Sequence, residues 1–454
     1  MTREILTGKE LLLRTMRHEM VPAVPWVPYA GVHAAKLKGY TASEILRDTD
    51  KLVESLMAVN ELYAPDGQPI VFDLQLEAEI LGCELYWVEN SPPSVATHPL
   101  AGVSEIPTKI PTKDDGRLPV VLKTMQTMKT KVGDHTALYG LITGPLTLAS
   151  HLRGTEIFMN MIRQPEYVKT LINYVTDVAD QILAYYIDAG MDVIALVDPL
   201  VSQISPKHFN QYLAEPYSRL FTSIKNRGAF SSFFVCGDAT KNIEVMCQTH
   251  PDSIAVDENI NMVTAKKITD QYNIVLCGNI PLTTKMLLGN QKDNMKFVVE
   301  FLESIDHHNL ILAPGCDMPF DTPIDNVIGC MQAVRNPSET KKVLENYEQP
   351  AVDLNSIVLP HYDQLSKPLV ELFTLDSASC AACTYMVKAA LDAVAAMGAD
   401  VDVVEYKFTK SENVARVMKM GVKNLPSLYI NGVLKFSSII PEQQVLIDEL
   451  KKVL

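Results

Sequence analysis

Three short apolar runs of the chain end in a cysteine. The runs FFVCGD, NIVLCGN and LILAPGCD place Cys236, Cys277 and Cys316 at their ends. Runs of this length beside a turn signal predict buried strands. The strands of a β/α barrel open onto one face, where such barrels keep their chemistry, so we expect the three thiols to converge at a single mouth. The alternative is that each cysteine is a small buried hydrophobic residue.

Carboxylates end three further apolar runs. Asp73 follows QPIVF, Asp198 follows MDVIALV and Asp257 follows SIAV. At the mouth of a barrel such acids can contact a substrate or hold other site residues in place by hydrogen bonds. They can equally cap a turn at a strand end. We take Asp73, Asp198 and Asp257 as candidate catalytic residues.

A second chemical signal lies near the C-terminus. Cys380-Ala381-Ala382-Cys383 follows an apolar run and opens a helical pattern. The dipole at the start of a helix lowers the pKa of a thiol, so this placement favours a redox dithiol. An inert structural pair is the alternative.

The elements that must position these residues alternate along the chain. About eight apolar runs alternate with helical patterns within residues 1–345, which predicts an α/β fold with a (β/α)₈ TIM barrel. Residues 346–367 carry mixed charge and prolines and are predicted to form a linker. A second series of strands and helices over residues 368–454 predicts a small α/β domain. Its Asn431-Gly432 pair between two apolar runs predicts a hairpin.

Composition narrows the classes of function. A chain of 454 residues exceeds one ordinary core, which agrees with two domains. The net charge of −14 argues against nucleic-acid binding, which needs a basic face. No apolar run is long enough to cross a bilayer and the start has no signal-peptide pattern, so we expect a cytoplasmic protein without a membrane partner. Eight cysteines in a chain of this length are no disulfide framework and point to metal or redox roles.

The order and wording of residues 1–345 resemble the uroporphyrinogen decarboxylase superfamily. The phrases ITGPLTLASHLRG, VDPLVSQISPKHFNQYLAEPY, VCGDATKNIEVM, CGNIPLTTKMLLG and LAPGCDMPFDTPIDNV carry the resemblance. They are most similar to its branch of corrinoid- and zinc-dependent methyltransferases, the methylcobamide:thiol methyltransferases. The resemblance implies a TIM barrel with a funnel at its C-terminal face. It also places Asp73 where the decarboxylases keep a pyrrole-binding aspartate.

The same resemblance implies zinc ligands. The methyltransferase branch holds zinc with a His-x-Cys pair and a later cysteine in a Pro-Gly-Cys phrase, and here Cys236 and Cys316 match the two cysteines. The histidine position is Phe234, which cannot bind metal. Cys277, at another expected strand end, could replace it. A zinc site of Cys236, Cys277 and Cys316 with an open fourth position would suit catalysis.

The C-terminal segment resembles the thioredoxin fold. Cys380 and Cys383 match its CxxC motif, and Pro426 in NLPSLYING matches the cis-proline that faces the cysteine pair in that family.

These resemblances imply methyl transfer as the leading function. A methyl group would move between a corrinoid and a thiol, or a similar small-molecule acceptor, that zinc activates. The chain has no corrinoid-binding motif of the Asp-x-His-x-x-Gly type, so the corrinoid would arrive on a separate protein. One alternative is decarboxylation of a tetrapyrrole, although WVPYAGVHAAKLKGY lacks the arginines that its acidic substrate needs. The other alternative is a non-catalytic redox or binding protein that uses the CxxC domain.

Overall fold

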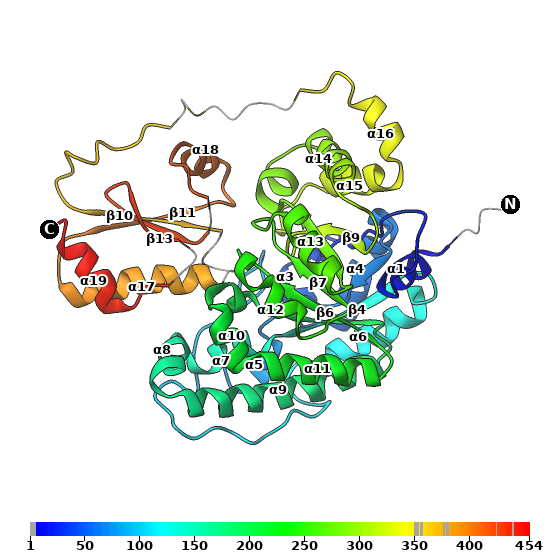
Figure 1. Cartoon of the computed structure of the whole chain (residues 1–454), viewed down its shortest axis with the longest axis horizontal. Coiled ribbons are helices and arrows are strands. Elements are labelled where there is room, and N and C mark those ends of the chain that lie inside the picture. The colour runs from blue at the N-terminus through cyan, green and yellow to red at the C-terminus, as the bar shows by residue number, and fades with distance from the viewer. Residues whose placement is uncertain are drawn as a thin grey trace. The chain divides into compact units, whose positions relative to one another are not determined.

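The chain folds into two compact units, Met1–Tyr347 and Glu348–Leu454 (Figure 1). The structure is a computed structural model that describes residues 6–348, 354, 357–375, 377, 381–423, 425–437 and 440–454. Each unit has a sheet and a hydrophobic core of its own, so each is described by itself.

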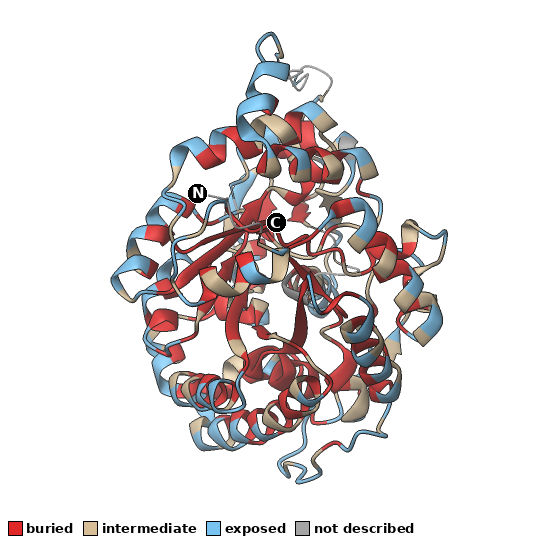
Figure 2. Cartoon of the chain, turned by 90° about the vertical axis from the view of Figure 1, so that its right-hand side faces the viewer, coloured by how far each residue is buried: buried red, intermediate tan, exposed pale blue. Residues whose placement is uncertain are grey.

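The first unit is built on a parallel sheet of seven strands, in the order β1-β4-β5-β6-β7-β8-β9. Figure 2 shows these strands buried in the middle of the unit, with helices around them whose outer faces are exposed. The strands are β1 (Gly67–Pro69), β4 (Ala137–Thr143), β5 (Val193–Val197), β6 (Phe230–Val235), β7 (Ser253–Val256), β8 (Val275–Ile280) and β9 (Leu310–Pro314).

The segment around Trp26 takes the eighth place in the barrel. Val27 donates its backbone N–H to Leu312 of β9 at 2.9 Å, and Asp66, just before β1, donates to the carbonyl of Trp26 at 2.9 Å. Trp26 itself forms an isolated parallel bridge with Leu312. This segment therefore joins the two edge strands, and the predicted TIM-barrel fold is confirmed. Its prolines at 22, 25 and 28 have no N–H to donate, which explains a bridge in place of a full strand.

Helices follow most of the strands and cover the barrel. Side-chain caps fix several starts: Thr7 and Glu10 form a capping box on the first helix, and Asn290 and Asp293 form another on α14. The longer helices are α1 (Gly8–Met16), α4 (Thr49–Tyr63), α6 (Leu118–Val132), α7 (Pro145–Arg153), α8 (Glu156–Arg163), α9 (Pro165–Asp188), α11 (Ala214–Asn226), α13 (Met262–Gln271), α14 (Gln291–Ser304) and α15 (Ile324–Arg335). The shorter ones are α2 (His33–Lys36), α3 (Ala42–Ile45), α5 (Leu76–Ile80), α10 (Pro206–Tyr212), α12 (Ile243–Cys247) and α16 (Pro337–Val343), with helical turns at Pro199–Gln203, Thr240–Asn242 and Leu282–Leu287. A two-stranded ribbon pairs β2 (Leu85–Tyr86) with β3 (Ser94–Val95).

The second unit has a four-stranded sheet in the order β11-β10-β12-β13. Strands β10 and β11 are parallel, whereas β12 runs antiparallel to β10 and to β13. Asn431 and Gly432 both have positive φ in the turn between β12 and β13, which confirms the predicted hairpin. The elements are β10 (Leu369–Thr374), α17 (Ala381–Met397), β11 (Asp402–Lys407), α18 (Ser411–Lys419), β12 (Ser427–Ile430), β13 (Val433–Ser437) and α19 (Gln443–Lys451).

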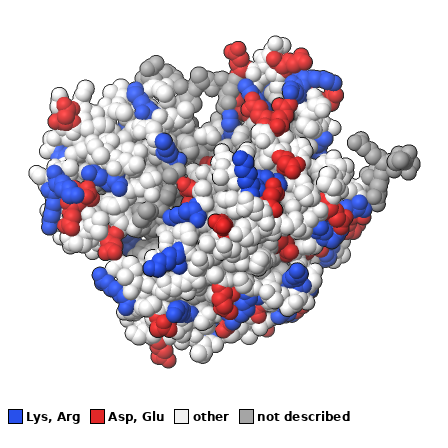
Figure 3. Space-filling view, in the orientation of Figure 1, with Lys and Arg blue, Asp and Glu red and all other residues white. Residues whose placement is uncertain are grey.

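Charge is spread without a dominant sign over the visible surface. On the face that Figure 3 shows, acidic and basic side chains of the described residues are interspersed. That face therefore offers no broad basic surface of the kind that nucleic acid requires. None of the helices within the described ranges is both long and apolar enough to cross a membrane.

Candidate active site

Cys236 and Cys316 meet at the carboxyl ends of β6 and β9. Their Cα atoms are 6.3 Å apart and their sulfurs lie against each other, although 80 residues separate them in sequence. Both residues are partly exposed. The structure thus brings together two of the three cysteines that the sequence places at the mouth.

A glycine beside each cysteine permits this approach. Gly237 has a φ of +83°, and a Cβ on it would lie 2.9 Å from the hydroxyl oxygen of Ser202. A Cβ on Gly315 would lie 2.7 Å from the backbone nitrogen of Glu258. Because real Cβ atoms do not approach so closely, glycine is required where these two strand ends turn toward the mouth.

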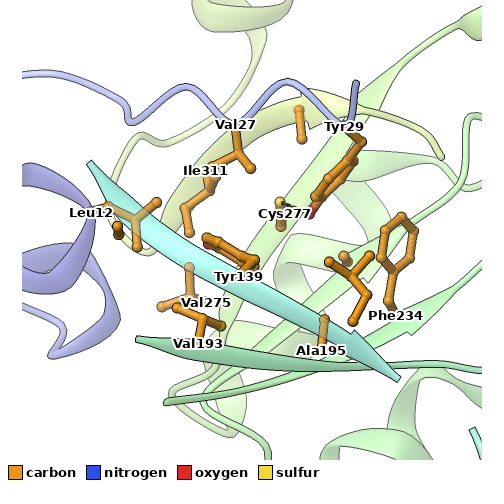
Figure 4. Close-up of a cluster of buried hydrophobic side chains, with 14 of the residues drawn as sticks. Leu12, Val27, Tyr29, Tyr139, Val193, Ala195, Phe234, Val275, Cys277 and Ile311 are labelled. Carbon is orange, nitrogen blue, oxygen red and sulfur yellow. Dashed lines mark hydrogen bonds between the residues drawn. The ribbon is translucent and has the colours of Figure 1, made fainter. Parts of the chain in front are cut away.

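Cys277 does not join the pair. The prediction that it ends its strand is wrong, because β8 continues to Ile280 and Cys277 lies opposite Ala255 and Ile311 inside the sheet. Its side chain is buried in the barrel core, where the thiol and the Tyr29 hydroxyl are hydrogen-bonded at 3.1 Å (Figure 4). Burial raises the pKa of this thiol to about 12.

Phe234 stands at the position where the resemblance to the zinc-dependent methyltransferases implies a histidine ligand. Its buried ring packs against those of Tyr29 and Phe72, whose centroids are 4.9 and 5.7 Å away; Figure 4 labels Phe234 and Tyr29. Catalytic zinc sites use three protein ligands and one open position. Over the described part of the chain, no three His, Cys, Asp or Glu side chains are grouped so that they could hold a metal ion. The described donors do not fit zinc, and Cys236, Cys277 and Cys316 do not form one ligand set.

Two acids lie at the end of β7, next to the cysteine pair. Asp257 is buried and accepts a hydrogen bond from the backbone N–H of Asn259 at 2.8 Å, and burial raises its pKa. Glu258 accepts one from the backbone N–H of Leu282. Desolvation, followed by the charge of Asp257, raises the pKa of Glu258 to about 8. The sequence gives no sign of this environment, because the groups that cover Glu258 come from other parts of the chain.

A pocket of about 420 Å³ opens beside these acids. Glu258, Asn279 and Pro281 line its barrel side, and Phe297 and Phe301 of α14 line the other. The side chain of Asn279 donates to the backbone carbonyls of Asp257 and Ile260, both at 2.8 Å, and so fixes the loop that carries the acids. An ionisable carboxyl group with a raised pKa thus faces a space that can admit a small molecule.

The hydrogen-bonding capacity of the Asp198 carboxylate is filled by donors of the protein itself. Its wholly buried carboxylate accepts bonds from the backbone N–H of Leu146 at 2.9 Å, the N–H and hydroxyl of Thr147 at 3.0 and 2.6 Å, and the hydroxyl of Tyr217 at 2.7 Å. These bonds tie the end of β5 to the first turn of α7 and to α11. Four donors occupy the lone pairs of this carboxylate, so the geometry favours a structural role over the predicted catalytic one.

Asp73 is engaged in an ion pair. Its side chain is fully buried, and a carboxylate oxygen lies 2.6 Å from the guanidinium of Arg117. Arg117 also contacts Glu79 at 2.6 Å and lies over the Trp87 ring. Arg117 gives no signal in the sequence, because it comes from the long segment between β3 and β4 and only the fold brings it to Asp73.

Of the three residues that carry the thioredoxin resemblance, Cys383 and Pro426 are among the described residues and Cys380 lies outside them. Cys383 is buried in α17, and its sulfur accepts a hydrogen bond from the backbone N–H of Leu375 at 3.3 Å. Pro426 is buried and follows a cis peptide bond, as the resemblance implies.

Comparison with known proteins decides the family. Residues 7–337 match the family described as Uroporphyrinogen decarboxylase (URO-D). The chain belongs to the URO-D family. Residues 371–451 match a thioredoxin domain, so a URO-D barrel is joined to a C-terminal thioredoxin domain in one chain.

Relatives in this URO-D family have two kinds of activity. The methylcobamide:CoM methyltransferase MtbA of Methanosarcina acetivorans is 26% identical over 339 residues, which cover 73% of this chain and 98% of the relative. A uroporphyrinogen decarboxylase of Wolbachia pipientis is 27% identical over 305 residues, which cover 64% and 86%. A solved methyltransferase from Methanosarcina mazei has a TM-score of 0.67 at 24% identity, over 73% of this chain and 99% of that one. The solved structure supports the barrel fold.

Proposed function

We propose that the barrel transfers a methyl group between a corrinoid, carried by a separate protein, and a thiol or similar soft acceptor. The observation that carries this proposal is the meeting of Cys236 and Cys316 at the ends of β6 and β9. These are the positions at which the methyltransferase branch keeps its two cysteines. The similarity to MtbA along nearly its whole length supports the same reading.

Glu258 is the group best placed to take the proton of an acceptor thiol. Its pKa of about 8 lies near the value of about 8.5 for a free thiol, so proton transfer between the two groups is nearly balanced in free energy. The acceptor would occupy the pocket between Glu258 and α14. As its sulfur takes the methyl group, its proton passes to the Glu258 carboxylate. Since the described donors do not fit zinc, no step of this scheme depends on a metal.

The environment of Asp73 argues against tetrapyrrole decarboxylation. A carboxylate that receives pyrrole N–H groups must face the substrate with free lone pairs. Here Arg117 already neutralises Asp73, and its side chain is fully buried. The similarity to decarboxylases of the same family is the finding that favours this alternative.

A methyl-transfer assay on the full chain tests the proposal. Methylcobalamin and a small thiol serve as probes, and the loss of the methylcobalamin absorbance is followed. We expect turnover by the reduced wild-type chain and a loss of at least tenfold in Glu258→Gln, because an amide cannot take the proton of the acceptor. Glu61→Gln, at an exposed position on α4, is the matched control and should retain activity.

The same samples are assayed for zinc and for consumption of uroporphyrinogen. Consumption of the tetrapyrrole without methyl transfer would overturn the proposal in favour of the decarboxylase. One zinc per chain that is lost in Cys236→Ser would show that donors beyond those described complete a metal site.

A further inference from the structure

The geometry of Cys236 and Cys316 permits a disulfide. Their Cα separation of 6.3 Å lies inside the usual range of about 4.4–6.8 Å for disulfides. The third family ligand is replaced by the buried ring of Phe234, and no third donor of the described residues completes the set. Two thiols in contact without a metal form an oxidisable pair.

This pair is also the most accessible to an oxidant among the described cysteines. Both of its residues are partly exposed at the mouth, whereas the other five described cysteines are buried. Burial also raises the pKa of Cys83 and Cys247 to about 12, so these thiols are rarely ionised at neutral pH. Oxidation follows thiolate character and exposure, which selects the pair at the mouth.

We propose that Cys236 and Cys316 form a reversible disulfide at the barrel mouth that stops turnover when oxidised, and that a dithiol of the thioredoxin class reduces it. The geometry and exposure of the pair support the disulfide independently of the proposed function. Its effect on methyl transfer rests on the proposed function.

The reaction balances with a peroxide as oxidant. The two thiols and one hydrogen peroxide give the disulfide and two waters, so the sulfurs lose two electrons and the peroxide gains them. In the return step a thiolate of the dithiol attacks one sulfur and the other cysteine leaves as a thiolate. The second thiol of the dithiol then attacks the mixed disulfide. The products are two cysteine thiols and an oxidised dithiol.

The dithiol can come from two sources. The chain carries a thioredoxin domain at residues 371–451 with a CxxC sequence at residues 380–383, and a separate thioredoxin would supply the same chemistry. With the domain of the same chain as the source, the reaction would be intramolecular.

Peptide mapping of the oxidised full chain tests the disulfide without any turnover. The folded protein is treated with hydrogen peroxide, free thiols are alkylated, and the digest is analysed by mass spectrometry. We expect a cross-linked peptide that contains Cys236 and Cys316 and has lost two hydrogens. Cys330→Ser should give the same cross-link, and Cys236→Ser should not. A folded wild-type chain whose Cys236 and Cys316 are both alkylated after peroxide would overturn the proposal.

Reduction rates of the cross-link separate the two sources. The oxidised wild type and Cys380→Ser are compared with limiting dithiothreitol, with glutathione, and with added reduced thioredoxin. Reduction at least fivefold slower in Cys380→Ser identifies the chain's own domain as the reductant. Equal rates, together with acceleration by added thioredoxin, identify a separate protein. Reduction that no dithiol accelerates beyond glutathione would overturn the dithiol part of the proposal.

Methyl-transfer assays on the same samples test regulation. We expect turnover to fall at least tenfold on oxidation and to return on reduction. Equal turnover of oxidised and reduced chains would overturn the switch. No turnover by either form would refute the proposed function and the regulation with it, while the mapped cross-link would stand.

Discussion

At the scale of the residue, the environment of Glu258 raises its pKa and so makes the stability of the protein depend on pH. The folded chain holds its proton up to a pKa of about 8, whereas an unfolded chain releases it near 4.5. Stability from this proton is complete below about pH 4.5 and is lost as the pH rises toward 8. The protein therefore keeps a carboxyl group at its mouth that costs stability at neutral pH, which is typical of a site selected for chemistry.

Glu258→Gln should become relatively more stable than the wild type as the pH rises. Glutamine has a similar shape and no charge to desolvate. Melting temperatures measured at pH 5.5 and pH 8.0 should show the gap between variant and wild type moving in favour of the variant. Glu61→Gln, at an exposed position on α4, is the control and should show a gap that does not change with pH. A constant gap for Glu258→Gln would contradict the raised pKa.

Phe234→His tests whether one side chain separates this site from a zinc site. The imidazole would replace the Phe234 ring beside Tyr29 and Phe72, in the cluster against which Cys236 and Cys316 pack. We expect the reduced variant to retain about one zinc per chain after dialysis, and the wild type to retain less. Metal analysis gives the answer, with Phe234→His/Cys236→Ser as the control that should lose the gain. Equal zinc contents in the variant and the wild type would show that histidine cannot reach the pair.

At the scale of the element, Asp198 joins β5, α7 and α11. Its buried carboxylate accepts the N–H groups of the first turn of α7, where the positive end of the helix dipole favours a negative charge. The helix that carries the TLAS phrase is thereby held against the barrel mouth. The sequence predicted a catalytic role for Asp198, whereas these bonds favour a structural one.

Asp198→Ala should destabilise the first unit by about 3 kcal/mol or more, because it leaves several buried donors without an acceptor. Urea unfolding of the variant measures the loss. Asp177→Ala, which removes an exposed acid of α9 paired with Arg219, should change stability by less than about 1 kcal/mol. The folded Asp198→Ala fraction should keep the KM of the wild type for its acceptor. A stable variant with lost turnover would instead favour the catalytic assignment.

At the scale of the whole molecule, two cores lie in one chain. The barrel interior and the α17–α19 side of the second sheet form separate clusters of buried residues. We expect calorimetry of the full chain to show two transitions, and fragments 1–347 and 348–454 each to reproduce one of them. A single transition in the full chain, with neither fragment folding, would show that the units depend on each other.

The sequence by itself determined the α/β barrel, the second small domain and the convergence of Cys236 with Cys316. Apolar runs that alternate with helical patterns define strand ends, and parallel strands place those ends on one face. It could not determine the depth of a residue within its strand. Cys277 was therefore expected at the mouth, whereas β8 runs three residues further and buries it.

Only the tertiary structure decided which charged groups are free to act. Arg117 reaches Asp73, and four donors from α7 and α11 surround Asp198, while the acid of Glu258 stays beside an open pocket. These partners are distant in sequence, and local patterns carry no information about them. Desolvation and hydrogen bonding set the chemistry of a carboxylate, and both arise from contacts that exist only once the chain has folded.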